Sequence, residues 1–266
     1  MNARISLLIA LGAAALAGCN EPVEPIGSVD QAIDLREAFG LDDVNAVGVT
    51  IDPNTEDTYI LDSVAGLYRL DGADAELVLA LADFPEPDVP LRSEFTDVAS
   101  MGNGRFAVLA RGDGYLLDTN AGTLQQWFCY EPGWMEEQQE QLSLNLAYDP
   151  LTDTLYSHAQ TLQDGEVVSA QVGTFDGGGA GDLSWFFLDD ASIESGGAAL
   201  DEDGALLLGS GSTLYRYALG ETSFDAVGSL AEHGVTEITG LIRSTTDGHY
   251  LVVDGASDRF FDVTIE

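Results

Sequence analysis

Lysine is absent from this sequence, and all nine basic residues are arginines, against 46 aspartates and glutamates. The formal net charge of the 266-residue chain is −37. A chain this acidic repels the phosphates of nucleic acids, so no nucleic-acid partner is expected. Two interpretations of the acidity remain open. The surface either binds cations or basic partners, or it is a solvated surface suited to high salt, where ions screen the repulsion between the acids.

Cysteine and histidine are also scarce, with two and three residues. Cys129 is the only thiol beyond the leader described below, so no intramolecular disulfide is expected, and we interpret it as a small buried side chain. His158, His233 and His249 fall in different repeats, and no Cys/His set has the spacing of a zinc site. These residues therefore predict no cofactor.

Long apolar runs are missing except at the start of the chain. Met1–Arg4 carries one positive charge, and the apolar segment Ile5–Ala15 is too short to span a bilayer as a mature helix. This pattern is typical of a signal peptide. The segment that closes it, Leu16-Ala17-Gly18-Cys19, resembles the lipobox of bacterial lipoproteins. The alternative is an ordinary secretory signal cleaved near Ala17, with Cys19 a bystander.

The lipobox resemblance implies that the chain is cleaved before Cys19 and lipidated on it. Asn20, in place of an aspartate, favours the outer over the inner membrane of the cell envelope. We therefore divide the chain into a signal peptide (residues 1–18), a lipidated cysteine and tether (19–27) and a folded domain (28–266). The lipid is expected to be the sole membrane contact, because the acidic chain repels anionic head groups.

The folded domain repeats one design five times: a short apolar strand, a turn of Asp, Pro, Asn or Gly, and two or three further strands. Small or short polar residues open the first strand of each unit: Gly48, Asp97, Asn145, Gly197 and Gly240. Their spacing matches a four-stranded propeller blade. We interpret Asp201-Glu202-Asp203-Gly204, which follows the fourth of these strands, as a turn.

The fifth unit ends with its third strand, so it lacks an outer strand. Ser28–Asn45 has the missing length and contains two candidate strands, Val29–Leu35 and Ala38–Leu41. Pairing the chain ends would remove an exposed sheet edge. The prediction is an all-β, monomeric propeller of five four-stranded blades closed in this way. The alternatives are an open or six-bladed ring, or a β-sandwich with a helix at Gln31–Phe39.

The segment Asn145–Pro150, followed by Thr154-Leu155-Tyr156, resembles the blade signature of bacterial NHL and YVTN propellers, as does Gly48–Pro53. That resemblance implies a fold and no single function. Gluconolactonase-like propellers are similar and hold an axial metal through Glu, Asn and Asp. Asp97 and Asn145 match that set by position.

Ligands of propellers usually meet the face that carries the fourth-to-first and second-to-third connections. The longest such connections here are Asp83–Glu94, Tyr130–Ser143 and His158–Ala170. The predicted ligand-binding residues on this face are Glu94, Asp97, Arg111, Tyr130, Trp134 and Asn145.

Each prediction has a competing account. Tyr130 and Trp134 beside acids suit a cationic or sugar-like ligand, or Trp134 covers a sheet edge. Asp97 and Asn145 offer oxygens to a cation such as Ca²⁺, or they hydrogen-bond within the inner strands. Arg111 suits a ligand carboxylate, or it neutralises a neighbouring acid.

Two functions follow from these residues. The first is a non-catalytic, envelope-anchored lipoprotein that binds a protein, peptide or carbohydrate. The second is a metal-dependent hydrolase of lactone or ester type, in which an axial cation polarises the carbonyl. Three or more carboxylate or amide groups converging in a central pocket would favour the hydrolase, and a plugged axis would favour the binding protein.

Overall fold

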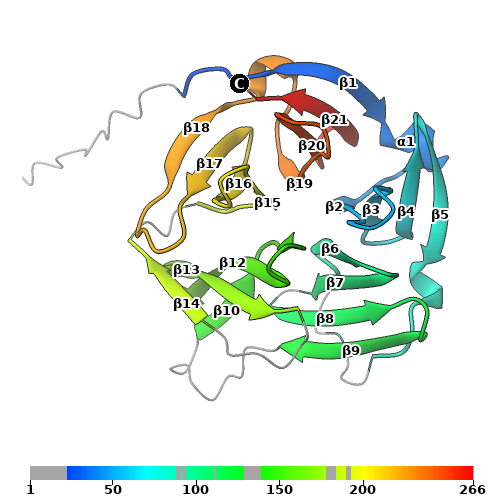
Figure 1. The fold of residues 1–266 in the computed structure, drawn as a ribbon, viewed down its shortest axis with the longest axis horizontal. Coiled ribbons are helices and arrows are strands. Elements are labelled where there is room, and N and C mark those ends of the chain that lie inside the picture. The colour runs from blue at the N-terminus through cyan, green and yellow to red at the C-terminus, as the bar shows by residue number, and fades with distance from the viewer. Residues whose placement is uncertain are drawn as a thin grey trace, which may run out of the picture.

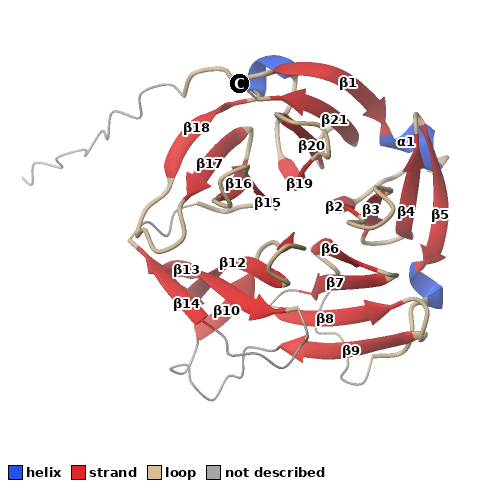
Figure 2. Cartoon of the chain, in the orientation of Figure 1, coloured by secondary structure: helices blue, strands red, loops and turns tan. Residues whose placement is uncertain are grey.

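The computed structural model describes residues 23–87, 91, 94–110, 112–128, 139–177, 184–189 and 193–265. Five antiparallel sheets stand around a central axis as the blades of a propeller (Figure 1). Strands make up nearly all of the regular structure, and the few helical turns lie at the periphery (Figure 2). The prediction of a five-bladed all-β propeller is confirmed.

Each blade runs from an inner strand at the axis to an outer strand. Blade 1 contains β2 (Ala46–Ile51), β3 (Thr58–Asp62), β4 (Gly66–Asp71) and β5 (Asp74–Ala80). Blade 2 contains β6 (Asp97–Gly102), β7 (Arg105–Ala110), β8 (Asp113–Asp118) and β9 (Thr123–Phe128). Blade 4 contains β15 (Gly197–Leu200), β16 (Leu206–Ser210), β17 (Thr213–Tyr217) and β18 (Asp225–Ser229). Short 3₁₀ turns follow two of the outer strands, η1 (Leu81–Asp83) and η3 (Ala231–His233).

Blade 5 joins the two ends of the chain. It contains β19 (Ile238–Arg243), β20 (His249–Asp254), β21 (Arg259–Thr264) and, as its outer strand, β1 (Ser28–Asp34). The β1–β21 pairing runs from Ser28 opposite Thr264 to Asp34 opposite Arg259. The predicted closure by the chain ends is therefore confirmed, and so is the first candidate strand.

The second candidate strand, Ala38–Leu41, is wrong, because a short helix occupies this region. The side chain of Asp34 accepts hydrogen bonds from the first backbone amides of α1 (Leu35–Phe39), and Gly40 ends the helix in the left-handed conformation, with φ of 66°. An acidic N-cap and a glycine after the last turn are the standard signals that begin and end a helix.

Blade 3 departs from the predicted pattern. The segment His158–Ala170 is not a loop, because β12 (Thr154–Gln163) and β13 (Glu166–Asp176) continue through it as one long hairpin. Asp164 and Gly165 both have positive φ, as a two-residue hairpin turn requires. The inner position is shared by β10 (Gln139–Ser143) and β11 (Ala147–Asp149), which pair with different halves of β12, and β14 (Ser184–Leu188) is the outer strand.

The core is a ring of five apolar clusters, one between each pair of neighbouring blades. Leu35 of α1 is fully buried in the cluster between blades 5 and 1. Because every blade is buried on both faces, each depends on its neighbours for its stability.

The segment just before β1 packs on blade 4. The backbone amide of Ile26 donates to Ser229 at 3.0 Å, and the amide of Ser229 donates to Glu24 at 2.9 Å. The residues directly before β1 are thus held against β18. No helix among the described residues has the length and apolar character that crossing a bilayer requires.

Candidate functional site

The axis is closed at the end where the inner strands begin, which is the predicted ligand face. A Cβ atom added to Gly240 would lie 2.8 Å from the backbone nitrogen of Val49, and one added to Gly48 would lie 2.3 Å from Oδ1 of Asp97. At these two positions the neighbouring inner strands therefore meet with no room for a side chain. This contact explains the glycines that mark the repeat.

Asp97 closes the gap between blades 2 and 3 with a carboxyl group in place of a glycine. Its Oδ1 accepts a hydrogen bond from the amide of Val98 at 2.7 Å, and its Oδ2 accepts one from the amide of Leu146 at 2.6 Å. Burial raises the pKa of Asp97 well above its usual value, and these two hydrogen bonds only partly offset that effect. Both carboxyl oxygens are thus engaged by the backbone.

Asn145 continues the same closure toward blade 4. Its Nδ2 donates to the hydroxyl of Ser195, and its Oδ1 accepts from the amide of His158 at 3.3 Å. The Ser195 hydroxyl also lies 2.7 Å from Nδ1 of His158. Because Ser195 accepts from Asn145, we assign its proton to the bond with Nδ1, which leaves the other imidazole nitrogen protonated.

That second nitrogen, Nε2 of His158, is buried and has no hydrogen-bond partner among the described residues. Burial lowers the pKa of His158 to about 3, so the imidazole is neutral throughout the physiological range. The ring also packs edge-on against Phe224 of the next blade. The histidine therefore belongs to the packing between blades 3 and 4.

The predicted site residues are only partly brought together. Asp97 and Asn145 meet at the closed end of the axis, whereas Glu94 is exposed and lines a separate cavity of about 350 Å³ with Phe84 and Phe95. Arg111, Tyr130 and Trp134 lie outside the described residues, as does Cys19.

The axial donors do not fit a metal ion. Among the residues that the structure describes, no three histidine, cysteine or carboxylate side chains converge on the axis. The Asp97 oxygens already accept backbone amides, and Oδ1 of Asn145 accepts another. A calcium ion requires six to eight oxygen ligands, and the described residues form no such group at this end of the axis.

Another cavity, called the central cavity below, lies at the opposite end of the axis, where the inner strands end and turn toward the second strands. Its volume is about 480 Å³. The walls are mostly apolar side chains of the five inner strands: Val49, Ile51, Val98, Leu146, Leu200 and Ile242. Exposed residues of the turns form its rim, among them Leu151, Glu202 and Asp203. An apolar cavity with a few polar groups is typical of ligand-binding sites.

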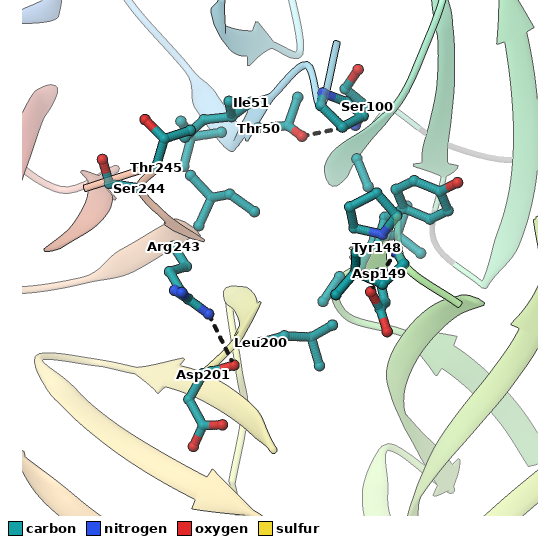
Figure 3. A pocket seen from close by; sticks show the side chains of 18 of the residues that line it. Thr50, Ile51, Ser100, Tyr148, Asp149, Leu200, Asp201, Arg243, Ser244 and Thr245 are labelled. Atoms are coloured by element: carbon teal, nitrogen blue, oxygen red, sulfur yellow. Dashed lines mark hydrogen bonds between the residues drawn. The ribbon is translucent and has the colours of Figure 1, made fainter. Parts of the chain in front are cut away.

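Arg243, the last residue of β19, is the only cationic side chain among the described residues that line this cavity. Its guanidinium donates one long hydrogen bond, of 3.4 Å, to the backbone carbonyl of Asp201 (Figure 3). No carboxylate of the described chain forms an ion pair with Arg243, although acids outnumber basic residues by 46 to nine. Most of its five donors therefore remain available.

Asp201, whose backbone carbonyl accepts from Arg243, has a carboxylate that is engaged elsewhere. Oδ2 of Asp201 accepts from Arg216 at 2.5 Å, and Oδ1 accepts from the backbone amides of Asp203 and Ala205. In Figure 3 the Asp201 carboxylate points away from Arg243. The structure thus has the predicted turn at residues 201–204. The Asp201 carboxylate is hydrogen-bonded within this turn and to Arg216, and only the Asp201 carbonyl contacts Arg243.

The opposite wall carries Tyr148 and one carboxylate, that of Asp149. The carboxylate oxygens of Asp149 accept from the amide of Leu151 and the hydroxyl of Thr152, at 2.8 and 2.7 Å. The hydroxyl of Tyr148 donates to Asp153, and burial, followed by this bond, raises the pKa of Tyr148 to about 12. The phenol therefore stays protonated, and the acids of this wall are held within their turns.

The predicted site did not include this cavity. The expectation for propellers places the site on the other face, and it does not include Arg243. The available signal was an arginine directly after an apolar inner strand, in a chain that has only nine basic residues.

Comparisons with known proteins establish no family. No protein-family model matches the chain, and no curated protein matches it. A luciferin-regenerating enzyme is 12% identical, with a TM-score of 0.46, over 84% of this chain and 76% of that one. The extracellular domain of a protein assigned as a hybrid two-component system from B. thetaiotaomicron is 13% identical, with a TM-score of 0.49, over 82% of this chain and 27% of that one. A chain of the mitotic checkpoint complex is 9% identical, with a TM-score of 0.46, over the whole of this chain and 99% of that one. At these identities and scores, none bears on the function of this chain.

Proposed function

We propose that this chain is a non-catalytic binding protein whose central cavity takes a ligand with an apolar portion and a carboxylate. Arg243 is the observation that carries the proposal. Arg243 is partly buried at the cavity wall and has no ion-pair partner among the described residues, so a ligand carboxylate can pair with its guanidinium there. The planar fork of arginine matches a carboxylate in two parallel bonds.

Among the three ligand classes expected from the sequence, a peptide or protein segment that ends in a free carboxylate fits best. The apolar walls suit one or two hydrophobic side chains, and the carbonyls and hydroxyls of the turns suit peptide amides. A sugar is expected to stack on an aromatic ring. Tyr148 is the single aromatic side chain among the described residues of the cavity wall, and its hydroxyl is committed to Asp153.

A metal-dependent hydrolase, the second function expected from the sequence, has no specific support. Asp97 and Asn145 are engaged in closing the axis, and no further His, Cys or carboxylate side chains among the described residues form a metal-binding group with them. The plugged axis is the arrangement that favours a binding protein.

The proposal is tested with a library of random peptides that have free C termini, selected on the full chain. Peptides with a hydrophobic C-terminal residue should be enriched. Arg243→Gln replaces the guanidinium with a neutral group. It should lower the affinity for the selected peptide at least tenfold, because a hydrogen bond to a charged group contributes about 1.5–3 kcal/mol. Arg69→Gln is the matched control, because Arg69 is half-exposed on blade 1 and pairs with Glu76. Equal binding by both variants would show that the ligand lies elsewhere.

The lipid anchor is part of the same proposal. The motif that ends at Cys19 would place the propeller on the envelope, and the outer membrane is favoured because Asn20 follows the cysteine. In cells given a labelled fatty acid, Cys19→Ala should abolish both the label and the membrane fraction. A variant that stays labelled and membrane-bound would reject the anchor and leave the cavity proposal intact.

A further inference from the structure

Blade 5 contains a group of metal-binding side chains outside the cavity. Asp30, His249 and Asp262 each offer one ligand atom, and these three atoms lie within 4.8 Å of one another. They come from β1, β20 and β21, which run side by side in the blade that closes the ring (Figure 1). The three residues thus connect the first strand of the domain to the last two.

A β-bulge positions the first of them. The β1–β21 register shifts between Val29 and Gln31, so Asp30 has no pairing partner on β21. Its Oδ2 lies 3.7 Å from Nδ1 of His249, and Oδ1 of Asp262 lies 2.9 Å from the same nitrogen. Bulges redirect a side chain that regular pairing would place elsewhere. At this bulge the Asp30 carboxylate approaches the same imidazole nitrogen as that of Asp262.

The arrangement places two carboxylates against a single imidazole nitrogen. A neutral imidazole carries one N–H, which can serve only one of the two carboxylates. In the described part of the chain no arginine pairs with Asp30 or Asp262. Two acids close together in so acidic a chain repel each other, and a bound divalent cation would neutralise both.

We propose that Asp30, His249 and Asp262 bind a zinc ion. Ligand atoms of a tetrahedral zinc site lie about 3.3 Å apart, because bonds of about 2.0 Å meet at the tetrahedral angle. The two measured distances from Nδ1 bracket this value. A histidine nitrogen beside two carboxylates selects zinc over calcium or magnesium, which prefer oxygen ligands. Water would complete the coordination.

Thr264 supports the site from behind. Its hydroxyl donates to Oδ2 of Asp30 at 2.5 Å and lies 3.3 Å from Nε2 of His249. With zinc on Nδ1, the ring proton resides on Nε2 and can be donated to this hydroxyl. Such outer contacts orient the ligands of protein zinc sites. The scarcity of histidine and cysteine predicted no zinc site, but a site with one histidine and two carboxylates leaves no spacing signal in the sequence.

This inference does not depend on the ligand of the central cavity. Zinc would join β1 to β20 and β21 and so lock the closure of the ring. Ions that bind only the folded state raise its stability in proportion to their affinity and concentration.

The test is calorimetric titration of zinc into the chelator-treated full chain, in excess Mg²⁺, together with thermal melting. We expect one zinc per chain and a melting temperature that zinc raises and calcium does not. His249→Gln should lower the affinity for zinc at least tenfold. His233→Gln, which removes the other partly exposed histidine, should leave that affinity unchanged. Cobalt in place of zinc should give the visible absorption of a tetrahedral site.

Equal zinc affinity in His249→Gln would overturn the proposal, as would equal stabilisation by calcium, magnesium and zinc, which indicates general screening of the acids. If His249→Gln does not fold, Asp30→Asn on the exposed edge strand replaces it. The same tenfold loss is expected there, and unchanged affinity would again contradict the site.

Discussion

Single buried polar residues determine how the inner strands meet at the closed end of the axis. Asp97 and Asn145 stand out in the sequence because they replace glycines of the repeat, and both lie at the axis as their spacing predicts. Their roles could not be predicted, because the partner that engages Oδ2 of Asp97 is the Leu146 amide of the next blade. The sequence shows where a polar residue falls in a repeat, but the contacts between blades decide whether its oxygens remain available.

His158 makes the stability of the domain depend on pH. The folded-state pKa of about 3 lies below the ordinary value of 6.5, so the unfolded chain binds the proton more readily. The neutral His158 makes its full contribution to the free energy of unfolding above about pH 6.5, and this contribution is lost as the pH falls toward 3. The expected loss approaches 1.4 kcal/mol per pH unit within this window.

Urea unfolding at pH 7 and pH 4.5 should therefore show that the wild type loses about 3 kcal/mol more than His158→Asn between these conditions. Asp97, which titrates in the opposite direction, is present in both proteins and cancels from the comparison. An identical loss in the two proteins would show that His158 is not buried in the neutral form.

At the scale of elements, the strand pattern and the closure of the ring could be predicted from the sequence. The prediction was wrong in two places, where a helix cap or a two-residue hairpin turn determines the local structure. The repeat of turn residues located the strands, and the length missing from the fifth unit identified β1. Asp34 and Gly40 bound a helix where a second strand was expected. In blade 3, Asp164 and Gly165 extended a hairpin through a predicted loop, because a two-residue turn lets both strands continue to its tip.

The α1 helix should stabilise the whole ring, because Leu35 is fully buried between the first and last blades. Leu35→Ala is expected to lower the unfolding free energy by about 2–5 kcal/mol, the usual cost of truncating a buried leucine. The loss should appear as one cooperative transition at a lower temperature. Leu151→Ala is the control, because Leu151 is 94% exposed. Equal melting temperatures for the two variants would show that α1 is not part of the ring core.

At the scale of the molecule, the net charge should oppose folding. The full sequence carries a formal charge of −37, and the proposed cleavage before Cys19 would remove Arg4 and bring the charge to −38. Self-repulsion destabilises compact states, and salt screens it.

The melting temperature of the chelator-treated domain should therefore rise as sodium chloride increases from about 0.01 to 1 M, over which the Debye length falls about tenfold. The experiment includes a chelator so that the zinc proposed for blade 5 does not contribute. A melting temperature that stays flat would mean that the acids are paired or bind a specific cation.

The end of the axis that is open could not be predicted from the sequence. Small residues at the starts of the five inner strands indicate that backbones meet there, but the sequence does not show how much space lies between the other ends of these strands. Ile51, Leu200 and Ile242 surround one cavity there, and Arg243 lines it without an ion pair among the described residues. The central claim is that Arg243 receives the carboxylate of a ligand.

The most direct test is a double-mutant cycle on the selected peptide, made with a free or an amidated C terminus and titrated into the wild type and Arg243→Gln. In the wild type, amidation should weaken binding at least tenfold, because the arginine loses its charged partner. In Arg243→Gln, amidation should have little effect, so the two changes should be strongly coupled. If amidation weakens binding equally in both proteins, the carboxylate does not meet Arg243 and the account is contradicted.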